Sequence, residues 1–129
     1  MTATFVAWDR PSPFLEAIGG FRRDPDDPLR LGFTVEGPKV NARGFLHAGT
    51  IAAIADVAIG HALAGSTDPP TPLVTVNLSC DLLGTARRGD WVDVEVALTK
   101  TGRRLSAGTA TFRTDRPIAV VSALFVPQG

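Results

Sequence analysis

The chain has 129 residues, of which 44% are hydrophobic, and its 13 basic residues balance its 13 acidic residues. This length suits a core that needs no disulfide, so we predict one domain over residues 1–129. The zero formal net charge excludes the strong field that draws a protein to nucleic acid or to an anionic membrane surface. One cysteine and two histidines fit neither a disulfide framework nor the usual zinc-ligand spacings, so we expect no metal and no organic cofactor.

The first thirty residues are uneven in composition. Residues 13–18 predict a short helix ended by Gly19 and Gly20, and the charged, proline-bearing residues 22–28 predict a loop. We therefore expect residues 1–28 to form a strap outside the core. No leader pattern and no apolar run of membrane-spanning length is present in the sequence, which predicts a cytoplasmic protein.

An alternating run and a long apolar run follow the strap. Leu31, Phe33 and Val35 alternate with polar or small residues, which predicts a half-buried strand. Residues 48–64 are apolar on every side, and a soluble helix of that kind must be enclosed, here by a sheet. Asp56 is the lone charge in this predicted helix, so a functional role is favoured over a purely structural one.

The rest of the chain predicts four strands. Alternating or apolar runs cover residues 74–82, 92–98, 104–114 and 118–126. In the first run we expect the apolar face, which includes Val74, Val76 and Cys80, to lie against the core and Thr75 to lie on the opposite face. The short turns imply that consecutive strands are antiparallel neighbours. The order predicts an α+β fold in which a curled antiparallel sheet wraps one central helix.

The start of the predicted helix offers groups that bind a polarised oxygen. Ala48 and Gly49 place backbone N–H groups where the helix supplies no partner and where its dipole is positive, which suits a thioester or oxyanion. Asp56 lies about eight residues further along, which is roughly 12 Å at ~1.5 Å per residue. At this distance the Asp56 carboxylate and the N-terminal amides of the same helix cannot act on one carbonyl. If they cooperate, they come from two chains, and the protein is at least a dimer.

The loop and helix together resemble a known family. The run from Asn41 through Gly44 and His47-Ala48-Gly49, followed by Asp56, resembles the signature of hotdog-fold acyl-CoA thioesterases of the phenylacetate-pathway (PaaI-like) group, in the 4-hydroxybenzoyl-CoA thioesterase superfamily. Residues 74–78 and 86–90 resemble the same group's third-strand region and the loop after it. Ala48 stands where the family usually has its first glycine, and residues 83–86 lack the family's frequent proline.

The resemblance implies a hotdog fold and hydrolysis of an aryl- or medium-chain acyl-CoA to the free acid and coenzyme A. It implies that Asp56 is the general base or nucleophile, that the amides of Ala48 and Gly49 polarise the thioester, and that Thr75 helps to place the water. It implies that Asn41 and His47 position the water or shape the loop. It also implies a homotetramer built as a dimer of dimers.

Basic residues at the predicted turns are candidates for the phosphates of coenzyme A, because arginine binds phosphate through a bidentate fork. They are Arg87, Arg88, Lys100, Arg103 and Arg104.

Several alternatives stay open. Asn41 is equally suited to hold a turn, and His61 is expected to be structural. A hotdog hydratase or dehydratase would pair Asp56 with His47 on an acyl-CoA. A non-catalytic acyl-CoA binding module is the third possibility.

Overall fold

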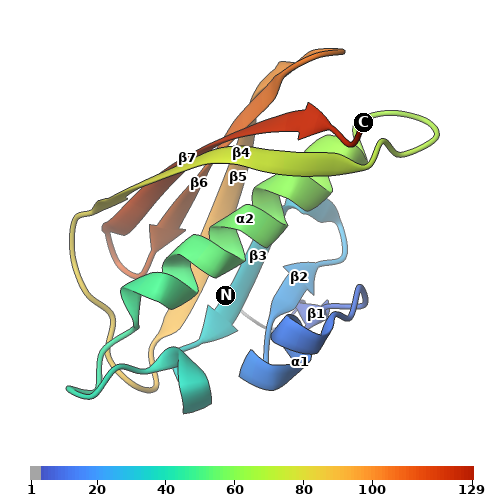
Figure 1. Cartoon of the computed structure of the whole chain (residues 1–129). Coiled ribbons are helices and arrows are strands. Elements are labelled where there is room, and N and C mark those ends of the chain that lie inside the picture. The colour runs from blue at the N-terminus through green and yellow to red at the C-terminus, as the bar shows by residue number, and fades with distance from the viewer. Residues whose placement is uncertain (1–3) are drawn as a thin grey trace.

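The computed structural model describes residues 4–129, which form an antiparallel sheet curved around one long helix (Figure 1). In chain order the elements are β1 (Val6–Ala7), α1 (Pro13–Ile18), β2 (Arg22–Asp24), β3 (Asp27–Thr34), the 3-10 helix η1 (Gly37–Lys39), α2 (Ala48–Ala64), β4 (Leu73–Leu82), β5 (Trp91–Thr101), β6 (Ser106–Arg113) and β7 (Pro117–Pro127). The predicted α+β class is confirmed. No helix within residues 4–129 is both long enough and apolar enough to cross a membrane.

The strand order differs from the predicted succession of neighbours. The sheet runs β1-β2-β3-β5-β6-β7-β4, so β4 lies at one edge and pairs with β7 instead of β5. Residues 83–90 therefore cross from β4 at the edge, past β7 and β6, to β5 inside the sheet. Backbone hydrogen bonds hold this crossing, from Leu83 N to Ile118 O at 2.9 Å and from Leu46 N to Ala86 O at 2.8 Å. The crossing thereby lies against the loop that enters α2.

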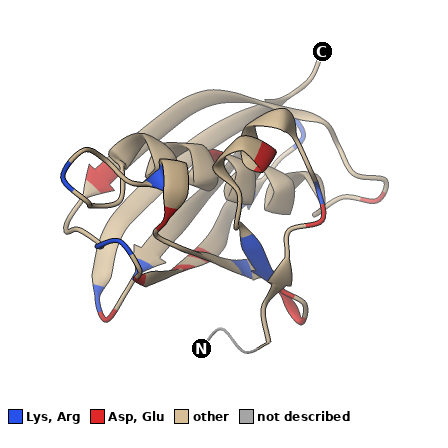
Figure 2. Ribbon diagram, turned by 90° about the horizontal axis from the view of Figure 1, so that it is seen from below, with Lys and Arg blue, Asp and Glu red and all other residues tan. Residues whose placement is uncertain are grey.

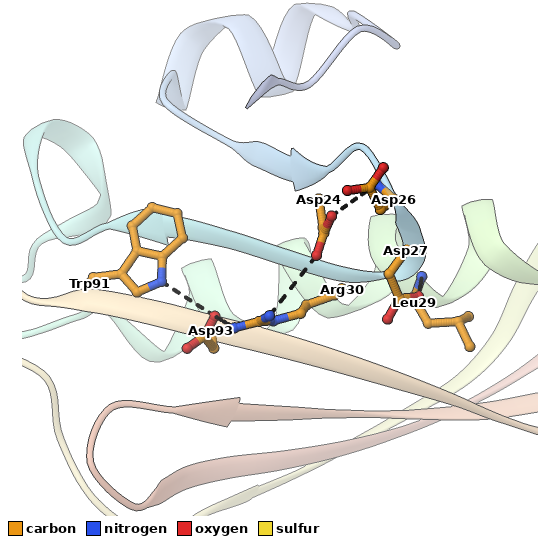
Figure 3. Close-up of polar contacts among 7 residues, drawn as sticks. All are labelled: Asp24, Asp26, Asp27, Leu29, Arg30, Trp91 and Asp93. Carbon is orange, nitrogen blue, oxygen red and sulfur yellow. Dashed lines mark hydrogen bonds and ion pairs between the residues drawn. The ribbon is translucent and has the colours of Figure 1, made fainter. Parts of the chain in front are cut away.

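The prediction of a loop over residues 22–28 is wrong, because two strands meet there. Asp24 and Asp27 are paired across a tight turn between β2 and β3. Short aspartate side chains accept from backbone N–H groups two residues ahead, Asp24 from Asp26 N and Asp27 from Leu29 N, both at 2.9 Å (Figure 3). The charged residues of this segment therefore belong to a tight turn between two strands.

An ion-pair cluster fastens the β2–β3 turn to β5. Arg30 lies 3.3 Å from Asp93 and 3.9 Å from Asp24, and Asp93 also accepts from the Trp91 indole at 3.3 Å (Figure 3). The Trp91 ring packs over Gly32, where an added β-carbon would lie 2.2 Å from it. Two apolar side chains of the N-terminal segment, Leu15 and Phe21, also join the main core cluster. Part of the expected strap therefore contributes to the core.

The core lies between the sheet and one side of α2. Phe33, Ile54, Ile59 and Phe112 have no exposed surface. Gly108 lets β6 approach the helix closely, since an added β-carbon there would lie 2.7 Å from Cγ2 of Ile59. The sheet thus covers the helix face that carries its isoleucines.

Candidate active site

Asp56 and Thr75 form a hydrogen-bonded pair between α2 and β4. The Thr75 hydroxyl donates to Oδ1 of Asp56 at 2.5 Å, and both residues are partly exposed. The bond holds one carboxylate oxygen and leaves the other free to accept a proton or to attack a carbon. The predicted site residues Asp56 and Thr75 are therefore brought together by the fold.

Thr75 reaches the helix because β4 contains an irregularity. The pairing with β7 shifts between Thr75 and Asn77, which leaves Val76 as an extra residue. Thr75 lies opposite the buried Phe125 and so shares the face that covers the helix. The expectation that Thr75 lies on the face away from the core is thus wrong. Strict alternation along the strand fails at the bulge.

The apolar side chains of β4 are exposed, contrary to the expectation that they lie in the core. Val76 is 53% exposed and Leu82 is 52% exposed, and Val74 is 46% exposed. Cys80 is also exposed. Because β4 is an edge strand, it has free backbone groups as well as exposed apolar side chains, a combination that favours pairing with another chain.

His47 caps α2 with its side chain. Its Nδ1 accepts from the backbone N–H of Gly49 at 2.8 Å, which places the proton of a neutral ring on Nε2. In this conformation the Gly49 amide is occupied by His47. The Ala48 amide, which is exposed, makes no hydrogen bond with any residue of the described chain. Ala48 is therefore the freer of the two predicted amide donors.

Asn41 holds the loop that leads to His47. Its side-chain oxygen accepts from Arg43 N at 2.9 Å and from Phe45 N at 3.1 Å. Its backbone N–H also donates to Phe45 O at 2.7 Å. The side-chain oxygen of Asn41 therefore holds the turn, as one of the two alternatives expected. The side-chain NH₂ group is left to donate elsewhere.

Lys39 is a buried residue that no sequence pattern marks as special. It is 1% exposed, and its ammonium donates to Ile18 O at 3.3 Å while its backbone carbonyl accepts from His47 N at 2.8 Å. Burial lowers the pKa of this ammonium, and the Glu36 carboxylate opposes the shift. Lys39 joins α1 to the start of α2. Its ammonium also lies 3.5 Å from Glu36 O, but the contact with Ile18, 21 residues away, is one that no local sequence pattern indicates.

The predicted arginines divide into two groups. Arg87 and Arg88 precede β5, and Arg103 and Arg104 follow it, so the 11-residue strand separates them by roughly 30 Å or more. Figure 2 likewise shows Lys and Arg at several separate places on the chain. Arg87 and Arg88 lie against the loop before α2, since Arg88 N donates to Gly44 O at 3.0 Å. One chain does not gather all four residues into one patch.

His61 lies on the flank of α2, away from the Asp56–Thr75 pair. Its ring packs edge-on against Trp8, with centroids 4.8 Å apart. Both residues line a cavity of about 250 Å³ between α2 and the N-terminal segment. Burial lowers the pKa of His61, and the Arg10 guanidinium lowers it further. The packing agrees with the structural role expected for this histidine.

Comparison with known proteins gives one family. A family model described as the thioesterase superfamily matches residues 43–120. A Pseudomonas aeruginosa protein described as an esterase is 36% identical over 119 residues, which make up 90% of this chain and 89% of that protein. The phenylacetic acid degradation protein PaaI of Thermus thermophilus has a TM-score of 0.74 at 22% identity, over 91% of this chain and 100% of that chain.

A Streptococcus mutans protein solved with acetyl CoA has a TM-score of 0.71 at 20% identity, over 78% of this chain and 80% of that chain. The fold and its match to these proteins define a hotdog-fold thioester hydrolase, which confirms the predicted fold and resemblance. The chain belongs to the thioesterase superfamily.

Proposed function

We propose that the protein hydrolyses an acyl-CoA thioester to a free acid and coenzyme A, with Asp56 as the catalytic carboxylate. The observation that carries the proposal is the Asp56–Thr75 hydrogen bond on the partly exposed side of a helix whose only other polar residues are Thr50 and His61. A carboxylate among apolar side chains is costly to desolvate, and such carboxylates are often functional. The hydrogen bond from Thr75 leaves one Asp56 oxygen free. That oxygen can take a proton from water or attack the thioester carbon directly.

The proposed chemistry needs a donor for the thioester oxygen. The Ala48 amide at the N-terminus of α2 suits this role, because the helix dipole adds partial positive charge there. Gly49 would join it only if the His47 side chain turned away from the Gly49 N–H. Asn41, whose NH₂ group can donate, and His47, through Nε2–H, are the groups we assign to holding water or the thioester.

The proposed active site contains two chains. Within one chain the Ala48 amide lies about 12 Å along α2 from Asp56, at ~1.5 Å per residue. The exposed edge strand β4 and the open side of α2, with Ala53 and Gly60 beside Asp56, offer the surface for a second copy. We infer a dimer in which each α2 presents its N-terminus to the other chain's Asp56, and a tetramer made from two such dimers.

The phosphates of coenzyme A need basic partners near the thioester. Arg87 and Arg88 lie beside the loop that leads into α2, so the chain that supplies the Ala48 amide also brings these two arginines. They are our leading candidates for the phosphates. Arg103 and Arg104 would serve only if the coenzyme extended along α2 toward its C-terminal end.

The decisive experiment is a thiol-release assay with a panel of aryl and aliphatic acyl-CoAs. Asp56→Asn should lower kcat by about a thousandfold, because the substitution keeps the size of the side chain and removes the base. Asp115→Asn, in the exposed β6–β7 turn, is the matched control and should retain full turnover.

Thermal unfolding should show both variants folded. Turnover by Asp56→Asn within a few fold of the wild type would refute the proposal. Loss of enoyl-CoA absorbance without thiol release would identify a hydratase, and tight binding without turnover would identify a binding module.

A further inference from the structure

Apolar side chains of α2 and β4 lie between the proposed carboxylate and the C-terminal end of α2. Leu63 follows Asp56 by about two turns and lies within roughly 20° of it around the helix axis. Leu73 precedes Thr75 by two residues on the same face of β4, so it lies about 7 Å from Thr75. Leu63 therefore continues the face of α2 that carries Asp56, and Leu73 continues the face of β4 that carries Thr75.

An aromatic ring packs against α2 along this stretch. Gly60 lies one turn beyond Asp56, and a β-carbon added there would be 3.1 Å from the Phe125 ring. Phe125 is paired with Thr75 across β4 and β7 and is 3% exposed. An acyl chain that leaves the Asp56–Thr75 pair in this direction would therefore meet the apolar side chains of Phe125, Leu63 and Leu73.

Leu63 and Leu73 also line a cavity of about 380 Å³, whose other lining residues are mostly polar. Leu63 and Leu73 line the end nearer Asp56, and Arg103 and Ser106 line the part formed by the β5–β6 turn. The near part suits methylene groups. The far part suits a polar or charged group.

Arg103 is the one charged residue among those that line this cavity. No hydrogen bond or ion pair joins its guanidinium to another residue within 4–129. Two hydroxyl groups of the cavity are engaged, since Ser66 donates to Leu63 O at 2.6 Å and Ser106 donates to Gly102 O at 3.2 Å. The guanidinium is thus the strong donor left for a ligand, and it matches a carboxylate.

We propose that the cavity receives the far end of the acyl group and that the enzyme prefers ω-carboxyacyl thioesters, whose terminal carboxylate pairs with Arg103. The proposal rests on the proposed acyl-CoA hydrolysis at Asp56. The leucine end of the cavity lies about 7–10 Å from the Asp56–Thr75 pair, and an extended acyl chain, which advances about 1.25 Å per carbon–carbon bond, spans this distance with roughly six to eight bonds. The preferred substrate is therefore a medium-length dicarboxylic acyl group, and not an aryl group.

The test compares octanedioyl-CoA with octanoyl-CoA, two substrates that differ by the terminal carboxylate. The wild-type enzyme should show a kcat/KM about fivefold higher for octanedioyl-CoA, the upper size expected of one ion pair at an exposed arginine. Arg103→Ala should remove this preference by lowering kcat/KM for octanedioyl-CoA alone. Arg103→Lys keeps the charge and should keep part of the preference.

Arg104 supplies the matched control, since it belongs to the same turn and does not line the cavity. Arg104→Ala should change kcat/KM for both substrates by the same factor. An equal loss with both substrates in Arg103→Ala would place Arg103 on the coenzyme and overturn the inference. A wild-type preference for octanoyl-CoA would overturn it as well, with acyl-CoA hydrolysis intact. Failure of the wild type to hydrolyse any acyl-CoA would instead refute the proposed function.

Discussion

The two faces of α2 differ in the size of their side chains and in their surroundings in the fold. One face, with Ile54 and Ile59, is closed by the sheet and has no exposed surface. The other face, with Ala53, Asp56 and Gly60, stays partly exposed. The side chains on the open face are small except for the carboxylate, so a second chain or a ligand can approach closely. The closed face stabilises the fold, and the open face carries the proposed chemistry.

The edge strand β4 extends the same contrast. Its backbone pairs with β7 on one side, and its apolar side chains remain exposed. In β5, by contrast, Val92 and Val94 alternate with polar residues and are fully buried. The exposed apolar surface of β4 lies beside the open face of α2, which is where the proposed second chain would bind. A site that needs two chains leaves such a surface on each one.

The largest expected effect is on assembly. Val76→Lys and Leu82→Lys, made singly, place a charge in the proposed interface and should give monomers with about 100-fold lower activity, because Asp56 loses the amide of the other chain. Sedimentation velocity and thiol release measure the two effects. Phe14→Lys changes an apolar residue of α1 that is 50% exposed and should alter neither. A fully active monomer would show that one chain suffices.

A larger side chain in β6 tests how closely the closed face of α2 packs against the sheet. Gly108→Val should lower the free energy of unfolding by about 1–3 kcal/mol, because its side chain would collide with Ile59. Urea unfolding measures the change. Gly84→Ala is the control, since its β-carbon would lie 3.6 Å from Ile118, an ordinary contact distance. Equal stability of the Gly108→Val and Gly84→Ala proteins would mean that the helix does not lie so close to β6.

The open face is tested at Thr75. Thr75→Val keeps the shape of the side chain, removes the donor to Asp56, and should lower kcat about tenfold. Thr75→Ser restores the hydroxyl and should recover most of the activity. Steady-state kinetics on both variants check this result. Full activity of Thr75→Val would remove the hydroxyl from the mechanism.

The smallest expected effect concerns acid stability at His61. Its pKa in the folded protein is lowered below the ordinary 6.5, chiefly by burial and then by Arg10. At pH values between the lowered pKa of the folded protein and the ordinary pKa of the unfolded chain, the unfolded chain binds more protons than the folded protein. The free energy of unfolding therefore falls as the pH drops through 6.5. His61→Gln should make stability less dependent on pH in this range, measured by urea unfolding at several pH values. An unchanged dependence would show that other groups cause it.

Much of the architecture could be predicted because it follows local rules. The helix over residues 48–64 and the short helix over residues 13–18 were predicted with the observed bounds. Their apolar runs and flanking Gly19 and Gly65 are local signals. Strand pairing was predicted less well, because short turns suggested that β4 and β5 are neighbours. The backbone contacts of residues 83–90 with Ile118 and Leu46 connect residues distant in sequence.

The sequence alone determined that the chain has one long apolar helix with a single carboxylate, Asp56, because residue type and helical period are local properties. Only the tertiary structure decided which groups meet that carboxylate. The bulge at Val76 turns Thr75 toward Asp56, and the His47 side chain occupies the Gly49 amide. These contacts depend on register and on backbone geometry, which side-chain alternation does not encode when one extra residue shifts it.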